Sequence, residues 1–127
     1  TGWSTAITAV ANTSNSTSGQ IDNSAQRSYS IIFNLTTIKA TSAGTGTFEL
    51  WILPEGSDGA VQDASIPPFG GTLVGVMTSE ATATERNQSF RVSEIPEKFK
   101  CWFNNQSGAN TTTGTDLRYR FVDFVDV

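Results

Sequence analysis

The sequence predicts an all-β domain, a sandwich of two sheets, from two observations. Apolar residues recur in short runs with a period of two, which is the spacing of strands with one buried face. Stretches of glycine, asparagine, serine, threonine and proline separate these runs and favour turns and loops. No segment has the 3.6-residue apolar spacing of a helix. The number and spacing of the runs favour a jelly roll, with an immunoglobulin-like sandwich as the alternative.

The length of 127 residues fits one domain, which we assign to residues 1–127. The single cysteine, Cys101, rules out an internal disulfide. Because it lies in an apolar run and free cysteine is often buried, we expect a structural thiol rather than a reactive one.

The N-terminal part of the chain carries the weakest strand pattern. Residues 3–11 are mostly small and predict a weak strand. Residues 12–27 consist largely of Asn, Thr, Ser, Gly and Gln with a lone Ile21, and they predict a polar loop or arm.

Clear alternation begins with the long apolar segment at 28–40 and continues at 47–53, where Pro54 then ends the ladder. After a loop over 55–71, further strands are expected at 72–77, 89–95, 98–104 and 117–125, with small or polar residues between them. The residues predicted to face the core are Phe48, Leu50, Ile52, Phe99, Cys101 and Phe103. On the segment at 28–40, Ile31, Phe33 and Leu35 are predicted to share one face.

Composition and charge argue against several classes of function. The chain has a formal charge of −4 and scattered basic residues, which argues against binding nucleic acid. No apolar stretch has the length of a membrane span. Without histidine there is no Ser-His-Asp or Cys-His arrangement and no ordinary zinc site, and the acids fit solvated surface positions better than a paired catalytic site. We therefore expect no enzyme activity, no catalytic or metal site and no cofactor.

Two tryptophans stand out because alternation places them on the outer face of their strands. Trp51 and Trp102 are either covered by a loop or a neighbouring subunit, or they bind sugar rings together with Tyr119. Burial at an interface is favoured, since tryptophan supplies a large rigid area with one polar edge.

The C-terminal strand also carries two outward hydrophobic residues, Val122 and Phe124, which a bare monomer seldom exposes. Arg118 and Arg120 lie on the same side of the strand and are expected to pair with acids across a subunit boundary.

Several short motifs then support a resemblance. They are the strand that ends in Leu53-Pro54, the Asp58-Gly59 turn, the Lys98-Phe-Lys100 strand that runs into Asn104-Asn105-x-x-Gly108, and the final Leu117-x-Tyr-Arg120. Over roughly residues 28–125 the chain resembles the head decoration, or cement, proteins of tailed phages. The N-terminal third is not matched.

The resemblance implies a non-enzymatic β-sandwich of the virion, bound to the major capsid protein on the outer surface of an icosahedral head, often as a homotrimer. Such a protein stabilises the shell because it binds only the assembled state, at many equivalent sites. The alternatives are a carbohydrate-binding module, and a subunit of a tail or fibre.

Overall fold

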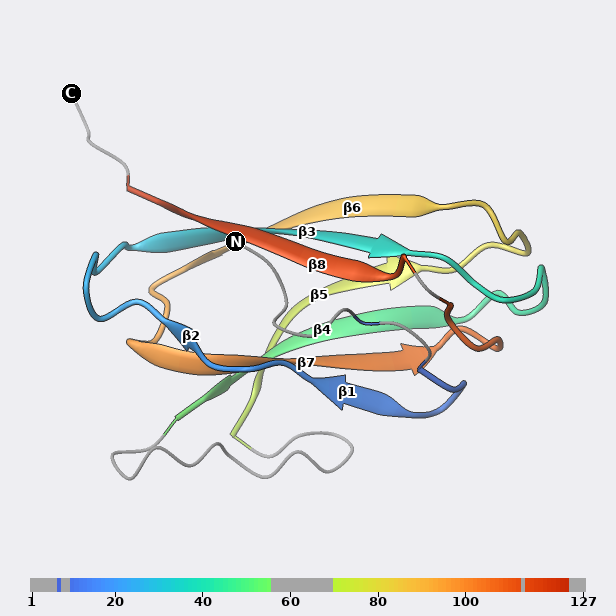
Figure 1. The fold of residues 1–127 in the computed structure, drawn as a ribbon, viewed down its shortest axis with the longest axis horizontal. Coiled ribbons are helices and arrows are strands. Elements are labelled where there is room, and N and C mark those ends of the chain that lie inside the picture. The colour runs from blue at the N-terminus through green and yellow to red at the C-terminus, as the bar shows by residue number, and fades with distance from the viewer. Residues whose placement is uncertain (1–6, 8–9, 56–69, 113, 124–127) are drawn as a thin grey trace.

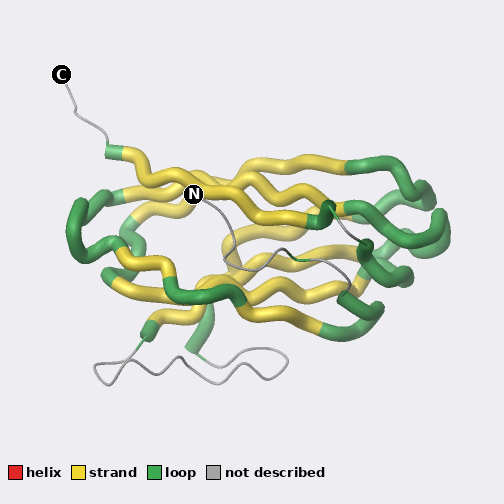
Figure 2. The backbone as a smooth tube through the Cα atoms, in the orientation of Figure 1, coloured by secondary structure: helices red, strands yellow, loops and turns green. Residues whose placement is uncertain are grey.

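The computed structural model describes residues 7, 10–55, 70–112 and 114–123. Over these residues the chain forms eight β-strands and no helix, in two antiparallel sheets that pack against each other (Figure 1). The predicted β-sandwich is therefore confirmed. Figure 2 shows how the strands form the two layers, with loops at both ends of the sandwich.

The larger sheet contains five strands in the order β1-β7-β4-β5, with β2 also paired to β7. The smaller sheet contains three, in the order β6-β3-β8. The strand bounds are β1 Asn15–Thr17, β2 Ile21–Asp22, β3 Ser30–Thr37, β4 Thr47–Pro54, β5 Thr72–Thr78, β6 Arg86–Ser93, β7 Lys98–Gln106 and β8 Asp116–Val122.

The strand pairs are nested around β4 and β5. β4 pairs with β5, β3 with β6, and β1 and β2 with β7, while β8 adds to the free side of β3. Nested antiparallel pairs rolled into two sheets are the principle of a jelly roll, which in its full form has eight strands. The immunoglobulin order differs, because there the first two strands pair with each other. Here β1 and β2 each pair with β7 instead.

The core follows the predicted alternation. Each of the six residues expected to face inward is at most 2% exposed, and Ile31, Phe33 and Leu35, which were expected to share a face, are fully buried. Phe48 and Phe103 stack across the β4–β7 pair with ring centroids 5.6 Å apart. Leu117 of β8 is also fully buried, as its side of the strand predicts.

Residues 12–27 are not simply a polar loop, so that expectation is corrected. Ser16 lies opposite Phe103 and Ile21 opposite Phe99, in two short strands along β7. A polar side chain of this segment also bonds to β7: the Ser18 hydroxyl accepts a hydrogen bond from the backbone amide of Cys101 at 2.8 Å. Backbone pairing with the otherwise exposed edge of β7 explains why a polar segment forms strands here, because strand preference depends strongly on context.

The strand expected at 3–11 lies mostly outside the described residues, and of it only Ile7, Val10 and Ala11 are placed. Ile7 and Val10 are buried in the core. The strand expected at 89–95 occupies Arg86–Ser93 instead.

A glycine allows the two sheets to meet along the side formed by β5 and β6. A Cβ atom on Gly75 would lie 2.2 Å from two ring carbons of Phe90. Real Cβ contacts are much longer, so the Phe90 ring occupies the space that any other side chain would need.

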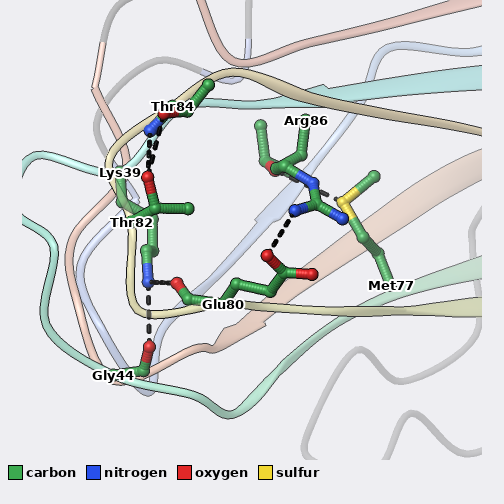
Figure 3. A network of polar contacts seen from close by, with 8 residues as sticks. Lys39, Gly44, Met77, Glu80, Thr82, Thr84 and Arg86 are labelled. Carbon is green, nitrogen blue, oxygen red and sulfur yellow. Dashed lines mark hydrogen bonds and ion pairs between the residues drawn. The ribbon is translucent and has the colours of Figure 1, made fainter.

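A buried lysine, Lys39, joins the β3–β4 loop to the β5–β6 loop at one end of the sandwich (Figure 3). The Lys39 ammonium donates to the carbonyl oxygens of Ala43 and Gly44, each at 2.9 Å, and to that of Glu80. Lys39 is only 5% exposed, and burial lowers the pKa of its amine. Nearby, Glu80 forms an ion pair with Arg86 at 2.7 Å. The β3–β4 and β5–β6 loops are thereby tied to one cation.

Candidate functional site

The predicted interface residues lie on two opposite faces of the sandwich. Trp51 and Trp102 lie on the outer face of the five-stranded sheet, directly opposite each other in the β4–β7 register. Arg118, Arg120 and Val122 lie on the outer face of the three-stranded sheet. Phe124 lies outside the described residues. The structure thus offers two separate surfaces rather than one site.

The first surface is an apolar patch made of Trp51, Leu73 and Val76. Leu73 is 44% exposed and Val76 41%, and the Trp51 side chain is partly exposed. Leu73 lies opposite Trp51 in the register, and Val76 lies opposite Glu49, the next outward residue of β4.

A β-bulge creates this patch. The β4–β5 register shifts between Leu50 and Trp51, since Leu50 pairs with Gly75 while Trp51 pairs with Leu73. Residues three apart on a regular strand point to opposite faces. The extra residue of a bulge restores them to one face, so both Leu73 and Val76 face outward.

Trp102 packs against Trp51 from the neighbouring strand β7. Its side chain is fully buried within the chain, and its ring meets that of Trp51 edge to face, with centroids 6.2 Å apart and an interplanar angle of 82°. The contact fixes the orientation of the Trp51 indole. Trp102 therefore offers a partner no surface of its own in this structure.

A row of polar groups borders Trp51 on the same face. The Glu49 carboxylate accepts hydrogen bonds from the Trp51 indole N–H at 3.4 Å and from the Asn104 amide at 3.0 Å. The Gln106 amide in turn donates to Asn104 at 3.2 Å. An aromatic plane beside carboxylate and amide groups can contact both the apolar face and the hydroxyls of a ligand.

The second surface is an arginine face on the three-stranded sheet, made of Arg91, Arg118 and Arg120. Arg91 and Arg120 both lie opposite Ile32 of the central strand, and Arg118 lies opposite Asn34 in the next outward row. With strands about 4.8 Å apart, Arg91 and Arg120 are separated by about 10 Å across Ile32. All three side chains are exposed.

Neighbouring groups hold two of these arginines in place. The Arg118 guanidinium contacts the Asp116 carboxylate at 3.2 Å, and Arg91 donates to the Ser30 hydroxyl at 3.5 Å. Beside Arg118 the sheet surface is hollowed into a shallow polar depression of about 260 Å³. It is lined by Asn34, Thr36, Glu85, Asn87, Gly114, Asp116 and Arg118.

The titratable residues of the core are shielded. Burial raises the pKa of the Cys101 thiol and, to a lesser extent, that of the Tyr119 phenol. Within the part of the chain that the structure describes, no three His, Cys, Asp or Glu side chains cluster as a metal site would need.

The sugar platform of Trp51, Trp102 and Tyr119, which the sequence offered as an alternative, is not assembled. Tyr119 belongs to the three-stranded sheet, where its ring packs 6.4 Å from that of Phe33. Only Trp51 of the three remains as an outward aromatic surface on the five-stranded sheet.

Sequence reasoning missed Leu73, Val76 and Arg91. Alternation cannot place Leu73 and Val76 on one face, because the bulge that does so leaves no clear signal in the sequence. Arg91 is outward by simple alternation against Phe90 and Val92, so a stricter treatment of that strand would have found it.

No family model matches the chain, and a search of curated proteins finds no significant match. The described residues also contain no helix long and apolar enough to cross a membrane.

Proposed function

We propose that this protein is a capsid decoration protein of a tailed phage, which binds the major capsid protein on the outer surface of the head, self-associates there as a trimer, and stabilises the shell. The observation that carries the proposal is the apolar patch of Trp51, Leu73 and Val76. Exposed apolar patches flanked by polar residues are typical of protein interaction sites.

The construction of the patch supports an adhesive role. The bulge and the buried Trp102 present it on a paired sheet, so little conformational entropy is lost when a partner covers it. Trp51 is of the residue type that most often dominates binding energy at interfaces. Repetition of one such contact over a symmetric shell gives an avidity far above that of a single contact.

Stability of head particles with and without the protein tests the proposal. We expect the protein to raise the temperature at which particles release their genome, and Val76→Asp to abolish that protection. Gln88→Asp is the matched control, because Gln88 is exposed on β6 of the other sheet. Equal survival of particles with and without the protein would refute the stabilising role.

The polar row beside Trp51 favours a second candidate function, a carbohydrate-binding module. Sugar rings stack on a tryptophan face while their hydroxyls bond to a neighbouring carboxylate such as that of Glu49, which is partly exposed beside Trp51. Binding to a glycan array that is lost in both Trp51→Ala and Glu49→Ala would favour this candidate. Retained particle protection in Glu49→Ala would favour the first.

A further inference from the structure

The polar depression on the outer face of the three-stranded sheet is built from two neighbouring rows of outward residues. In the first row, Asn87 of β6 and Asp116 of β8 lie on either side of Thr36 of the central strand β3. In the second row, Arg118 of β8 lies beside Asn34 of β3. The first row is about 10 Å wide and the two rows lie about 7 Å apart, given the spacing of strands and of alternate residues along a strand. The depression therefore has the breadth of a small ring-shaped ligand.

The residues of this lining depart from local structural preference. Asparagine is depleted in strands, yet Asn34 lies in the middle of the central strand and Asn87 on the neighbouring edge strand. Gly114 has a φ of +99°, and a Cβ atom there would lie 2.7 Å from the Cδ1 atom of Ile38. A residue with a side chain is disfavoured at this position, so the edge of the depression next to Gly114 stays open. Departures of this kind are concentrated at functional sites.

Hydrogen bonds within the sheet fix the orientation of the lining. The Thr36 hydroxyl donates to the Asn87 side-chain oxygen, and the Asn87 amide donates to the Glu85 carboxylate at 3.4 Å. The Asn34 amide donates to the Ser89 hydroxyl at 3.2 Å. Side chains that are already oriented lose little conformational entropy when a ligand binds.

Several polar atoms of the lining have no hydrogen-bond partner among the described residues. The acceptors of this kind are one carboxylate oxygen of Glu85, one of Asp116 and the side-chain oxygen of Asn34. The donors are the terminal guanidinium nitrogens of Arg118. Donors and acceptors thus line the same depression. A hydroxyl group can use both, because it donates one hydrogen bond and accepts others.

The charge of the lining favours a neutral ligand. Glu85 and Asp116 together carry −2 and Arg118 carries +1, so the lining has a net charge of −1, which disfavours phosphate and other anions. A divalent cation would have to compete with the Arg118 guanidinium for the Asp116 carboxylate. The residues that line the depression include no aromatic ring, so hydrogen bonds rather than stacking have to hold the ligand.

We propose that this depression binds one neutral sugar ring. The hydroxyl groups of the ring donate to the carboxylates of Glu85 and Asp116 and accept from the Arg118 guanidinium. The volume of about 260 Å³ lies just below the range of about 300–1,000 Å³ for pockets that hold drug-sized molecules, which fits one ring rather than a chain of rings. The site lies on the sheet opposite Trp51, so this inference goes beyond the proposed function and does not depend on it.

Amide chemical shifts of the isotope-labelled protein, measured by NMR during titration with a sugar, test the site. The probes are the methyl glycosides of glucose, galactose and mannose, each added up to about 100 mM. We expect at least one of them to shift the backbone amides of Asn34, Thr36 and Asn87 in a saturable way. The expected dissociation constant is about 1–30 mM, because the depression is shallow and offers hydrogen bonds alone.

Two variants locate the binding site. Asn34→Ala and Arg118→Ala should each raise the dissociation constant by about fivefold or more, since each removes a group that bonds to the ring. Asn15→Ala is the matched control for Asn34→Ala, because Asn15 is an exposed strand residue of the other sheet, and it should leave the dissociation constant unchanged. A thermal unfolding curve for each variant confirms that it folds.

Four results would each overturn the site. They are the absence of saturable shifts with all three sugars, shifts confined to the surroundings of Trp51, equal effects of Asn34→Ala and Asn15→Ala, and saturable shifts of the same amides with calcium chloride but with none of the sugars. Shifts around Trp51 would favour the second candidate function instead. Protection of head particles is measured separately, so a failure of the sugar site leaves the decoration role standing.

Discussion

Replacing Lys39 with methionine tests the role of the buried cation. Methionine keeps a long unbranched side chain but removes the charge and the three hydrogen bonds to the carbonyl groups of Ala43, Gly44 and Glu80. The substitution therefore separates the polar contacts of the lysine from its packing.

The cost can be worked from these contacts. A hydrogen bond to a charged group contributes about 1.5–3 kcal/mol, and a buried group left without a partner costs about 1–3 kcal/mol. Ala43 and Glu80 are exposed residues whose carbonyls can regain water, whereas Gly44 is half-buried. Methionine also avoids the desolvation cost of a buried ammonium group, which offsets part of the loss. We expect Lys39→Met to lower the free energy of unfolding by about 2–3 kcal/mol.

Urea unfolding followed by tryptophan fluorescence measures this difference, and a thermal scan should show a midpoint about 10 °C lower. Lys100→Met is the control, because Lys100 is half-exposed on the outer face of β7 and undergoes the same chemical change. It should change stability by less than about 0.5 kcal/mol. If both variants are equally stable, Lys39 does not tie the loops together and our reading of this end is wrong.

Three further predictions concern packing and burial. Gly75→Val should cost about 3 kcal/mol or abolish folding, because the new side chain meets Phe90; chemical denaturation measures this, and wild-type stability would contradict it. Trp102→Ala should cost about 3–5 kcal/mol and Trp51→Ala distinctly less, since only Trp102 is fully buried; equal losses in urea unfolding would contradict this. Burial raises the pKa of Cys101, so the unfolded chain ionises near pH 8.5 while the folded chain stays protonated. Stability should therefore fall by about 2 kcal/mol between pH 8.5 and 10, a loss absent from Cys101→Ala, and a thiol reagent should react only on unfolding.

Much of the fold could be predicted from the sequence because the signal is local. Phe33, Leu50 and Phe103 each alternate with polar or outward neighbours, and a strand with one buried face has no other arrangement. The same reasoning placed Arg118 and Arg120 outward on the last strand, where the register with β3 confirms them.

The candidate surfaces were harder to predict from the sequence, because they depend on which strands pair rather than on a local signal. The patch depends on a bulge between β4 and β5, and a bulge is a property of two paired strands rather than of either one. The burial of Trp102 likewise depends on what else covers its sheet, although its outward direction is set by alternation.

By itself the sequence determined which residues of β3, β4 and β7 share one face of their strand, because apolar residues recur there with a period of two. Only the tertiary structure decided that the polar segment at Asn15–Asp22 pairs with β7, that Lys39 meets carbonyls from two loops, and that Arg91 and Arg120 flank one isoleucine. These relations join residues far apart in the chain. Backbone hydrogen bonds and charge interactions between residues so far apart produce no periodic pattern in the sequence, since they depend on which strands become neighbours.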